Sequence, residues 1–194
     1  KKVSFEIGSE MKSVGEVMAI GRKFVEAIQI AIRMLAIGLH GLVCNKISFN
    51  NIEDELKKPT DKRLLAVAEA IKKGYSIDKI HALTKIDKWF LYKIKNVVEI
   101  EAKLKKYTIK NISNDLLIAA KKLGFSDFQI ARLIITDSKG MDKNMHENML
   151  KIRNLRIRNR IIPVVKQIDT LAAEYPARTN YLYLTYNGEK DDIA

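Results

Sequence analysis

The stretch Ala70-Ile71-Lys72-Lys73-Gly74-Tyr75-Ser76 recurs fifty residues later as Ala120-Lys121-Lys122-Leu123-Gly124-Phe125-Ser126. In both copies a glycine is followed by an aromatic residue and then by a serine. A short segment with apolar residues in register follows each serine, over residues 77–83 and 127–133. The chain therefore contains an internal repeat, and this repeat decides the fold of its middle part.

Each part of the repeat has a distinct role in a tight turn between two helices. Glycine adopts the positive φ that ends many helices without the steric cost that other residues meet. The aromatic residue can pack back onto the helices. The serine hydroxyl can accept a hydrogen bond from the free N–H groups that begin the next helix. We therefore predict two helix–Gly–helix hairpins, one around Gly74 and one around Gly124.

Apolar residues at spacings of three and four predict further helices on both sides of the repeat. The expected helices cover residues 23–35, 52–56, 64–71, 87–106 and 144–158. Gly38 and Gly41 should end the first of them, and Thr60 or Asp61 should cap the third.

The longest helical pattern, over residues 87–106, has a broad apolar face and should be the centre of the packing. Short helices need such packing, because helical propensity alone does not hold them. We expect Trp89, Phe90 and Phe125 to form the core around this helix.

The two ends of the chain have a different pattern. Residues 1–22 alternate and contain glycines, which is typical of strand and turn, and residues 168–173 have a helical pattern. Residues 181–186 alternate again and end at Asn187-Gly188. The predicted fold is all-α: a helical-hairpin bundle of two helix–Gly–helix repeats around a long central helix, with short mixed α/β flanks.

The formal net charge of +12 is the strongest feature of the composition. The 35 Lys and Arg are dispersed among 23 Asp and Glu, which favours a solvated surface over a basic arm. Residues 141–166 hold seven basic side chains against two acidic ones, whereas residues 167–194 hold two against five. This change of sign predicts a boundary near Pro163.

Residues that could carry chemistry are isolated in the sequence. His40, His81 and His146 each lack a second ligand at metal-binding spacing. Cys44 has no histidine partner in sequence, and a single cysteine fits a reducing compartment. The glycines at positions 8, 15 and 21 match neither a P-loop nor a dinucleotide fingerprint. We predict no catalytic, cofactor-binding or metal-binding residue, and the lack of a long apolar run predicts no membrane span.

Two functions remain open on these observations. The first is a helical interaction module that presents apolar and basic faces to other proteins. The alternative is a basic helix-turn-helix-like nucleic-acid-binding module, although residues 77–83 and 127–133 are short and offer few base-reading side chains beyond Gln129 and Arg132.

Four stretches of the chain resemble the large chain of carbamoyl-phosphate synthetase, in the order in which that family has them. Residues 11–22 are similar to the end of the first ATP-grasp half. The signature of the helical oligomerisation domain is matched by Leu83-Thr84-Lys85-Ile86-Asp87-Lys88-Trp89-Phe90-Leu91 and by Leu123-Gly124-Phe125-Ser126-Asp127-Phe128-Gln129-Ile130-Ala131. Residues 165–175 and 179–186 resemble the link into the second half, and the tyrosine-rich ending resembles the eukaryotic branch. Around residues 136–154 the chain departs from the family pattern.

The resemblance implies an internal segment of a longer enzyme, in line with a chain that opens without an initiator methionine. It assigns residues 1–40 to the end of the first ATP-grasp half, 41–165 to the helical oligomerisation domain and 166–194 to the connector into the second half. The parent would be a ligase that makes carbamoyl phosphate from bicarbonate, ammonia or glutamine and two ATP, for pyrimidine or arginine biosynthesis.

The resemblance also implies partners and a location. ATP and Mg²⁺ or Mn²⁺ would serve the parent, with none of their ligands in this segment. The partners would be the two ATP-grasp halves, a glutaminase domain or subunit and further copies of the chain, in the cytoplasm or the mitochondrial matrix. Some apolar residues exceed what two short hairpins obviously need to bury: Ile109, Ile112, Leu116, Ile134 and Ile135. These surplus apolar residues either form a contact between copies of the chain or fill the core between the hairpins, and both interpretations stay open.

Overall fold

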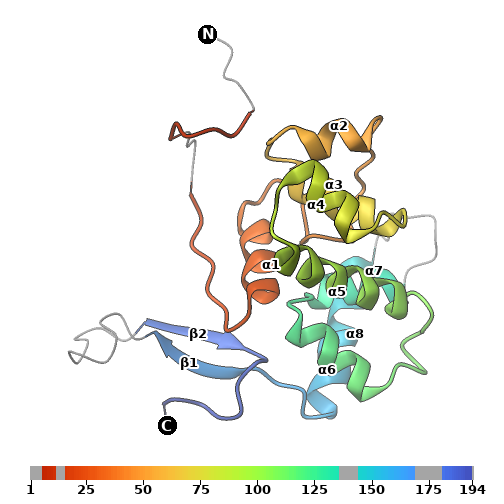
Figure 1. Cartoon of the computed structure of the whole chain (residues 1–194). Helices are drawn as coiled ribbons and strands as arrows, with labels where there is room; N and C mark the ends of the chain where they lie inside the picture. Colours follow the sequence, from red (N-terminus) through yellow and green to blue (C-terminus); the bar gives the residue numbers. More distant parts are fainter. Residues whose placement is uncertain (1–5, 12–15, 136–143, 169–180, 194) are drawn as a thin grey trace.

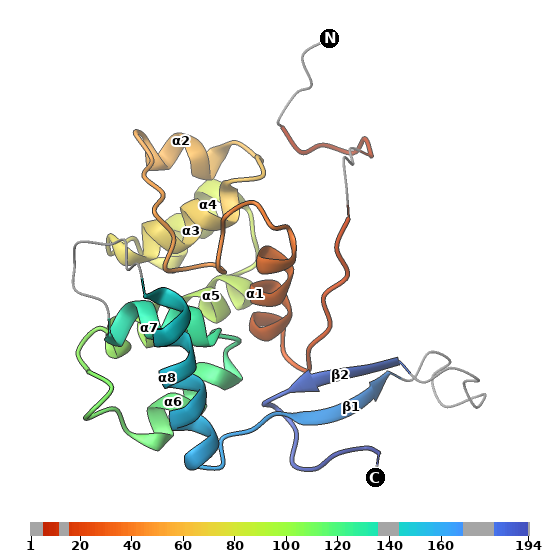
Figure 2. The same ribbon diagram turned by 180° about the vertical axis from the view of Figure 1, so that it is seen from behind.

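The computed structural model of the chain describes residues 6–11, 16–135, 144–168 and 181–193, and this part is mostly helical (Figure 1). The helices are α1 (Phe24–Met34), α2 (Ile52–Lys57), α3 (Arg63–Lys72), α4 (Ile77–Thr84), α5 (Lys88–Leu104), α6 (Asn114–Lys122), α7 (Asp127–Ile134) and α8 (Met145–Arg158). The strands β1 (Val164–Ile168) and β2 (Tyr181–Thr185) form an antiparallel pair beside the helical body (Figures 1 and 2). The expectation of a helical domain is confirmed.

The two repeat turns have the same local structure. Gly74 and Gly124 both have φ +84°. The next N–H group, of Tyr75 or Phe125, donates to the carbonyl five residues back, at 3.0 and 3.1 Å. This is the hydrogen bond expected where a left-handed glycine ends a helix. The sequence prediction for both turns is confirmed.

The serine of each repeat caps the following helix. Ser76 Oγ accepts from the Lys79 N–H and Ser126 Oγ from the Gln129 N–H, each at 3.1 Å. The second cap is a full capping box, because the Gln129 side chain also accepts from the Ser126 N–H at 3.0 Å.

Helix α5 is the centre of the packing, as its apolar face predicts, and it contacts α1, α3, α4, α6 and α7. The side chains of Leu91, Ile94 and Leu104 are fully buried on it. Phe125 is buried as expected, with 1% of its surface exposed. The aromatic residue of the second copy of the repeat is therefore part of the core.

The prediction that Trp89 and Phe90 lie in the core is wrong, since they are 51% and 41% exposed. They lie in the first turn of α5, whose N-cap is Asp87, and the Asp87 side chain accepts from the Trp89 N–H at 2.7 Å. There they form a surface cluster with Phe24, whose ring centroid lies 5.9 Å from that of Trp89 and 5.0 Å from that of Phe90.

Truncating Trp89 to alanine should therefore lower the free energy of unfolding by only about 1 kcal/mol, in proportion to its half-buried surface. Leu91→Ala, at a fully buried position on the same helix, should cost about 2–5 kcal/mol. Urea unfolding of both variants measures the difference. A loss for Trp89→Ala as large as that for Leu91→Ala would contradict the surface position.

Most helix boundaries agree with the sequence, but the expected cap of α3 does not. Its N-cap is Lys62, without a side-chain hydrogen bond. Thr60 instead pairs through its backbone with Glu6 in an isolated bridge, and so holds the N-terminal flank. At the end of α1, Leu35 is the C-cap and Ala36 takes a positive φ of 53°, ahead of the glycines expected to end the helix.

The flanks contain one strand that the sequence pattern missed. Strand β2 is where the alternation predicts it. The helix expected from residue 168 is wrong at its first position, because Ile168 ends β1, and its remainder lies outside the described residues. A five-residue strand next to Pro163 has too short an alternation to be recognised without its partner.

The surplus apolar residues pack on the core. Ile134 is buried, and the other four are partly buried against the core cluster: Ile109, Ile112, Leu116 and Ile135. Of the two readings that the sequence left open, the structure favours core filling.

Candidate functional site at the junction of helices and flanks

Two buried glutamines join helix α1 to the second repeat turn. Gln29 Nε2 donates to the Leu123 carbonyl at 3.0 Å, and Gln29 Oε1 accepts from the Leu42 N–H at 3.2 Å. Gln129 Nε2 donates to Gln29 Oε1 and to the Val43 carbonyl, both at 3.3 Å. Buried amides of this kind are stabilising only when their partners are in place, so this contact fixes one arrangement of α1 against α7.

Two arginines extend this contact inside the protein. Arg33 Nη1 donates to the Gly124 carbonyl at 2.9 Å, and Arg132 Nη1 donates to the Cys44 carbonyl at 2.9 Å. Burial lowers the pKa of Arg33 from its ordinary value. Because Gln129 and Arg132 are turned inward, neither is available to read bases, and the nucleic-acid alternative loses its candidate side chains.

Glu26 joins the C-terminal flank to the same place. One of its carboxylate oxygens accepts from Thr185 Oγ1 at 2.6 Å, and the other accepts from the Arg22 N–H and from Asn187 Nδ2, at 3.0 and 3.1 Å. Asn187 Nδ2 also donates to the Lys122 carbonyl at 2.8 Å. A carboxylate with only 3% of its surface exposed is thus held by neutral donors from both flanks.

A buried ion cluster lies beside this contact. Lys121 Nζ is 2.9 Å from one oxygen of Asp127, and Arg156 Nε is 2.9 Å from the other. Both cations also face the ring of Tyr186, at 5.0 and 5.9 Å from its centroid. The cluster ties α6, α7 and α8 to the residue that follows β2.

The pKa shifts in this cluster follow from burial and pairing. Desolvation lowers the pKa of Lys121, although Asp127 opposes it. Burial by itself raises the pKa of Asp127, but Lys121 and Arg156 outweigh it and hold the pKa below its ordinary value.

His40, His81 and Cys44 lie in structural environments, whereas His146 is an exposed residue of α8. His40 stacks on Phe128 at 3.9 Å between ring centroids, and burial, Arg132 and Arg33 lower its pKa. His81 Nδ1 lies 2.7 Å from the Ile86 carbonyl oxygen. Burial raises the pKa of Cys44 to about 12, so its thiol stays protonated. Within the described ranges, no group of three or more His, Cys, Asp or Glu could hold a metal ion.

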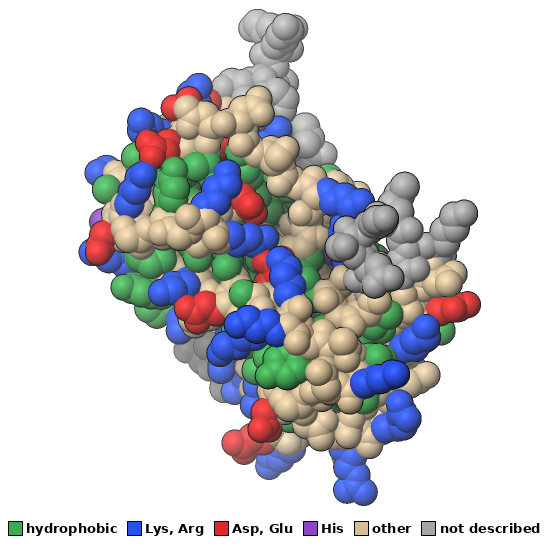
Figure 3. All heavy atoms as spheres, turned by 90° about the vertical axis from the view of Figure 1, so that its right-hand side faces the viewer, with side chains coloured by type: hydrophobic (Ala, Val, Ile, Leu, Met, Phe, Trp, Pro, Cys, Tyr) green, Lys and Arg blue, Asp and Glu red, His purple; other side chains and the backbone are tan. Residues whose placement is uncertain are grey.

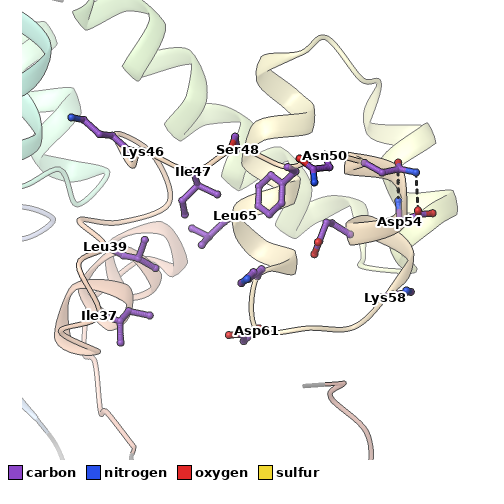
Figure 4. Close-up of a pocket in the computed structure, with 14 residues that line it drawn as sticks. Ile37, Leu39, Lys46, Ile47, Ser48, Asn50, Asp54, Lys58, Asp61 and Leu65 are labelled. Atoms are coloured by element: carbon purple, nitrogen blue, oxygen red, sulfur yellow. Dashed lines mark hydrogen bonds between the residues drawn. The ribbon is translucent and has the colours of Figure 1, made fainter. Parts of the chain in front are cut away.

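A surface groove of about 770 Å³ runs between α2, the start of α3 and the loop before α2. Its floor is apolar, with Ile37, Leu39, Ile47 and Leu65 turned toward the same hollow (Figure 4). Its rim mixes Lys46 and Lys58 with acidic side chains such as Asp54, so it has no strong preference for either sign of charge.

The basic side chains on the face that Figure 3 shows do not form a continuous stripe. On the face shown in Figure 3, Lys and Arg are interspersed with Asp and Glu and with apolar side chains. Several lysines are engaged locally, such as Lys79 with Glu53 at 2.6 Å and Lys88 with Asp78 at 2.6 Å. No helix among the residues that the structure describes is long and apolar enough to span a membrane.

The residues of this junction match no motif of catalytic or metal-binding groups, so they were not among the candidates that the sequence offers. A signal was present: Glu26 and Gln29 lie three residues apart within the apolar stripe of residues 24–35. Polar side chains on the buried face of a helix need partners, which here are supplied by two distant segments of the chain.

Comparisons with known proteins show which family the chain belongs to. Residues 16–150 match the family described as carbamoyl-phosphate synthetase large chain, oligomerisation domain. The chain is 48% identical over 198 residues to the multifunctional protein CAD of Squalus acanthias, covering 99% of this chain and 8% of that protein. It is 49% identical over 198 residues to the carbamoyl phosphate synthase large chain of Sulfurisphaera tokodaii, covering 100% of this chain and 18% of that protein.

A mitochondrial, arginine-specific carbamoyl phosphate synthase large chain of Schizosaccharomyces pombe is 45% identical over 193 residues, which cover 98% of this chain and 16% of that protein. The chain thus spans less than a fifth of the length of these relatives. The family model matches residues 16–150 and these relatives are 45–49% identical over 98–100% of the chain, so the chain belongs to the carbamoyl-phosphate synthetase large-chain family, as its oligomerisation domain.

Proposed function

We propose that the chain is the internal helical oligomerisation and linker domain of a carbamoyl-phosphate synthase. The parent ligase would make carbamoyl phosphate from bicarbonate, ammonia or glutamine nitrogen and two ATP, with Mg²⁺ or Mn²⁺. The segment itself would bind no nucleotide or metal and would hold no catalytic residue. Its role would be to position the parts of the parent that do.

The proposed division assigns residues 1–40 to the end of the first ATP-grasp half, 41–165 to the helical domain and 166–194 to the connector into the second half. Within the helical domain, the two helix–Gly–helix hairpins would form a bundle around α5. The contacts of α5 with α3, α4, α6 and α7 support this arrangement.

The observation that carries the proposal is the meeting of both flanks at one turn of the helical domain. Glu26 comes from the first segment and Thr185 and Asn187 from the third, while the Lys122 carbonyl belongs to the second. A displacement of either flank would break buried hydrogen bonds, which are costly to leave unmade. The domain would therefore hold the two synthetase halves in a fixed relation.

The further partners would be a glutaminase domain or subunit and other copies of the chain, in the cytoplasm or the mitochondrial matrix. Since the surplus apolar residues pack on the core, a contact between copies would use the exposed apolar side chains instead. The Phe24, Trp89 and Phe90 cluster is a candidate, because exposed aromatic groups are frequent anchors of interfaces.

The chain should therefore self-associate, and more strongly as salt screens the repulsion between copies of net charge +12. Sedimentation at low and moderate ionic strength measures this, with Trp89→Ala as the variant that should weaken association. In parallel, the longer protein that contains the chain should form carbamoyl phosphate, while the chain alone should not hydrolyse ATP. A monomer at every salt concentration and at high micromolar protein would contradict the role in self-association.

A further inference from the structure

The outer edge of strand β1 is covered by the end of the described chain. The N–H groups of Val165 and Gln167 donate to the carboxylates of Asp191 and Asp192, at 2.7 and 3.0 Å. The Asp192 N–H donates in turn to the Val165 carbonyl at 2.9 Å. This edge therefore has its backbone groups paired and cannot accept another strand.

Among the described residues, none pairs with the outer edge of strand β2. Val165 pairs in register with Leu184, and Gln167 with Leu182. In an antiparallel ladder, two residues directly opposite each other point their N–H and C=O groups either both toward the partner strand or both away from it. The backbone groups of Val165 and Gln167 point away from β2, so those of Leu182 and Leu184 point away from β1. No described segment forms a hydrogen bond with the N–H or C=O groups of these two leucines.

The side chains at this edge are apolar and exposed. Leu182 and Leu184 share a face of the sheet and are 45% and 59% exposed. An edge strand that offers both unpaired backbone groups and adjacent leucines is a template for a further strand, since such edges are otherwise blunted by charge or proline. Two strands alone are also marginally stable in water.

The sheet is nevertheless firmly attached to the helical body. Thr185, at the end of β2, is fully buried and donates to Glu26, and Tyr186 faces Lys121 and Arg156. The open edge is thus presented in a fixed orientation beside α1 (Figure 2). A fixed edge loses little conformational entropy when a strand adds to it.

We propose that β2 is extended by a third strand, which comes from a segment of the same polypeptide outside residues 1–194, pairs with Leu182 and Leu184 and covers their side chains. This rests on the proposed function only in placing the chain within a longer polypeptide. The recognition is β-augmentation: backbone hydrogen bonds give the affinity, and an alternating apolar strand fits the leucine face.

The length of the relatives favours this source over a second copy of the chain. They match nearly all of this chain yet are more than five times longer, so a long further polypeptide is covalently linked to the matching segment in such proteins. A linked segment acts at a high effective concentration, whereas a second copy has to reach the edge from solution.

Hydrogen exchange of the full-length protein, resolved to single amides by mass spectrometry, tests the proposal. The Leu182 and Leu184 amides should exchange at least about tenfold more slowly than in the unfolded protein, and equally slowly after dilution. Exchange at the unfolded rate would mean an open edge and would overturn the proposal. Protection that is lost on dilution would assign the edge to a second copy and would overturn it too.

Two variants at one position sharpen the result. Leu184→Pro removes an outward N–H group without removing a bond to β1, so the Leu182 amide should lose its protection while the inward Tyr183 amide keeps it. Leu184→Ala retains the N–H group and should keep the Leu182 amide protected. Unchanged protection of Leu182 in Leu184→Pro would refute the pairing. Protected amides in a protein that forms no carbamoyl phosphate would refute the proposed function and leave this inference standing.

Discussion

Replacing Gly124 with alanine should lower the free energy of unfolding by about 2–4 kcal/mol, whereas the same change at Gly74 should lower it by about 1 kcal/mol. Both glycines have φ +84°, so the strain of the left-handed conformation is common to the two variants. A Cβ at Gly124 would lie 3.0 Å from Glu26 Cα and 3.2 Å from Gln29 Cβ, but one at Gly74 would have no atom within 4 Å.

The difference between these variants therefore reports the packing of α1 against the second turn. Helix α1 has to shift in the Gly124 variant, and the hydrogen bonds of Gln29 shift with it. Urea unfolding followed by circular dichroism gives both losses under one set of conditions. Equal losses would mean that α1 does not press on the turn in solution.

Replacing Asp127 with asparagine should lower the free energy of unfolding by about 3–5 kcal/mol, because it leaves Lys121 and Arg156 buried without their counter-charge. Asp115→Asn is the matched control: Asp115 is an exposed residue in the first turn of α6, where it has the same favourable relation to the helix dipole. Its replacement should change stability little. Similar losses for the two variants would show that the ion cluster does not contribute to stability.

The pH dependence of stability provides a second measurement on Asp127. Its pKa is lowered in the folded state, so its contribution is present above the ordinary aspartate pKa of about 4 and is lost as the pH falls through the folded pKa. The unmodified chain should therefore lose more stability than Asp127→Asn between neutral and acidic pH. Urea unfolding of both proteins at several pH values measures this. If both lose the same free energy of unfolding as the pH falls, the pH dependence does not come from Asp127.

The sequence predicted much of the helical part from local rules, and the repeat shows why. A glycine, an aromatic residue and a serine act on their own neighbours, so the two turns and both serine caps could be read without knowing the fold. The long apolar face of α5 likewise identified the central helix. The strand β1 could not be read in this way, because its five residues become a strand only against β2.

The candidate site depended on contacts between residues far apart in the sequence. Glu26 meets Thr185 across 159 positions, and Gln29 meets Gln129 across 100. Nothing local to either glutamine indicates the other. Trp89 was misplaced for the same reason: its apolarity predicts burial, but the first turn of α5 reaches past the core to the surface.

The sequence by itself determined that the chain is helical, where its two turns lie and which family it resembles, because propensity, capping and glycine geometry act over a few residues. Only the tertiary structure decided how the copies of the repeat differ. The first turn leaves Gly74 in open space, while the second presses Gly124 against α1 and joins both flanks there. The physical reason is that two turns with one local conformation acquire different roles only through the distant side chains that pack on them.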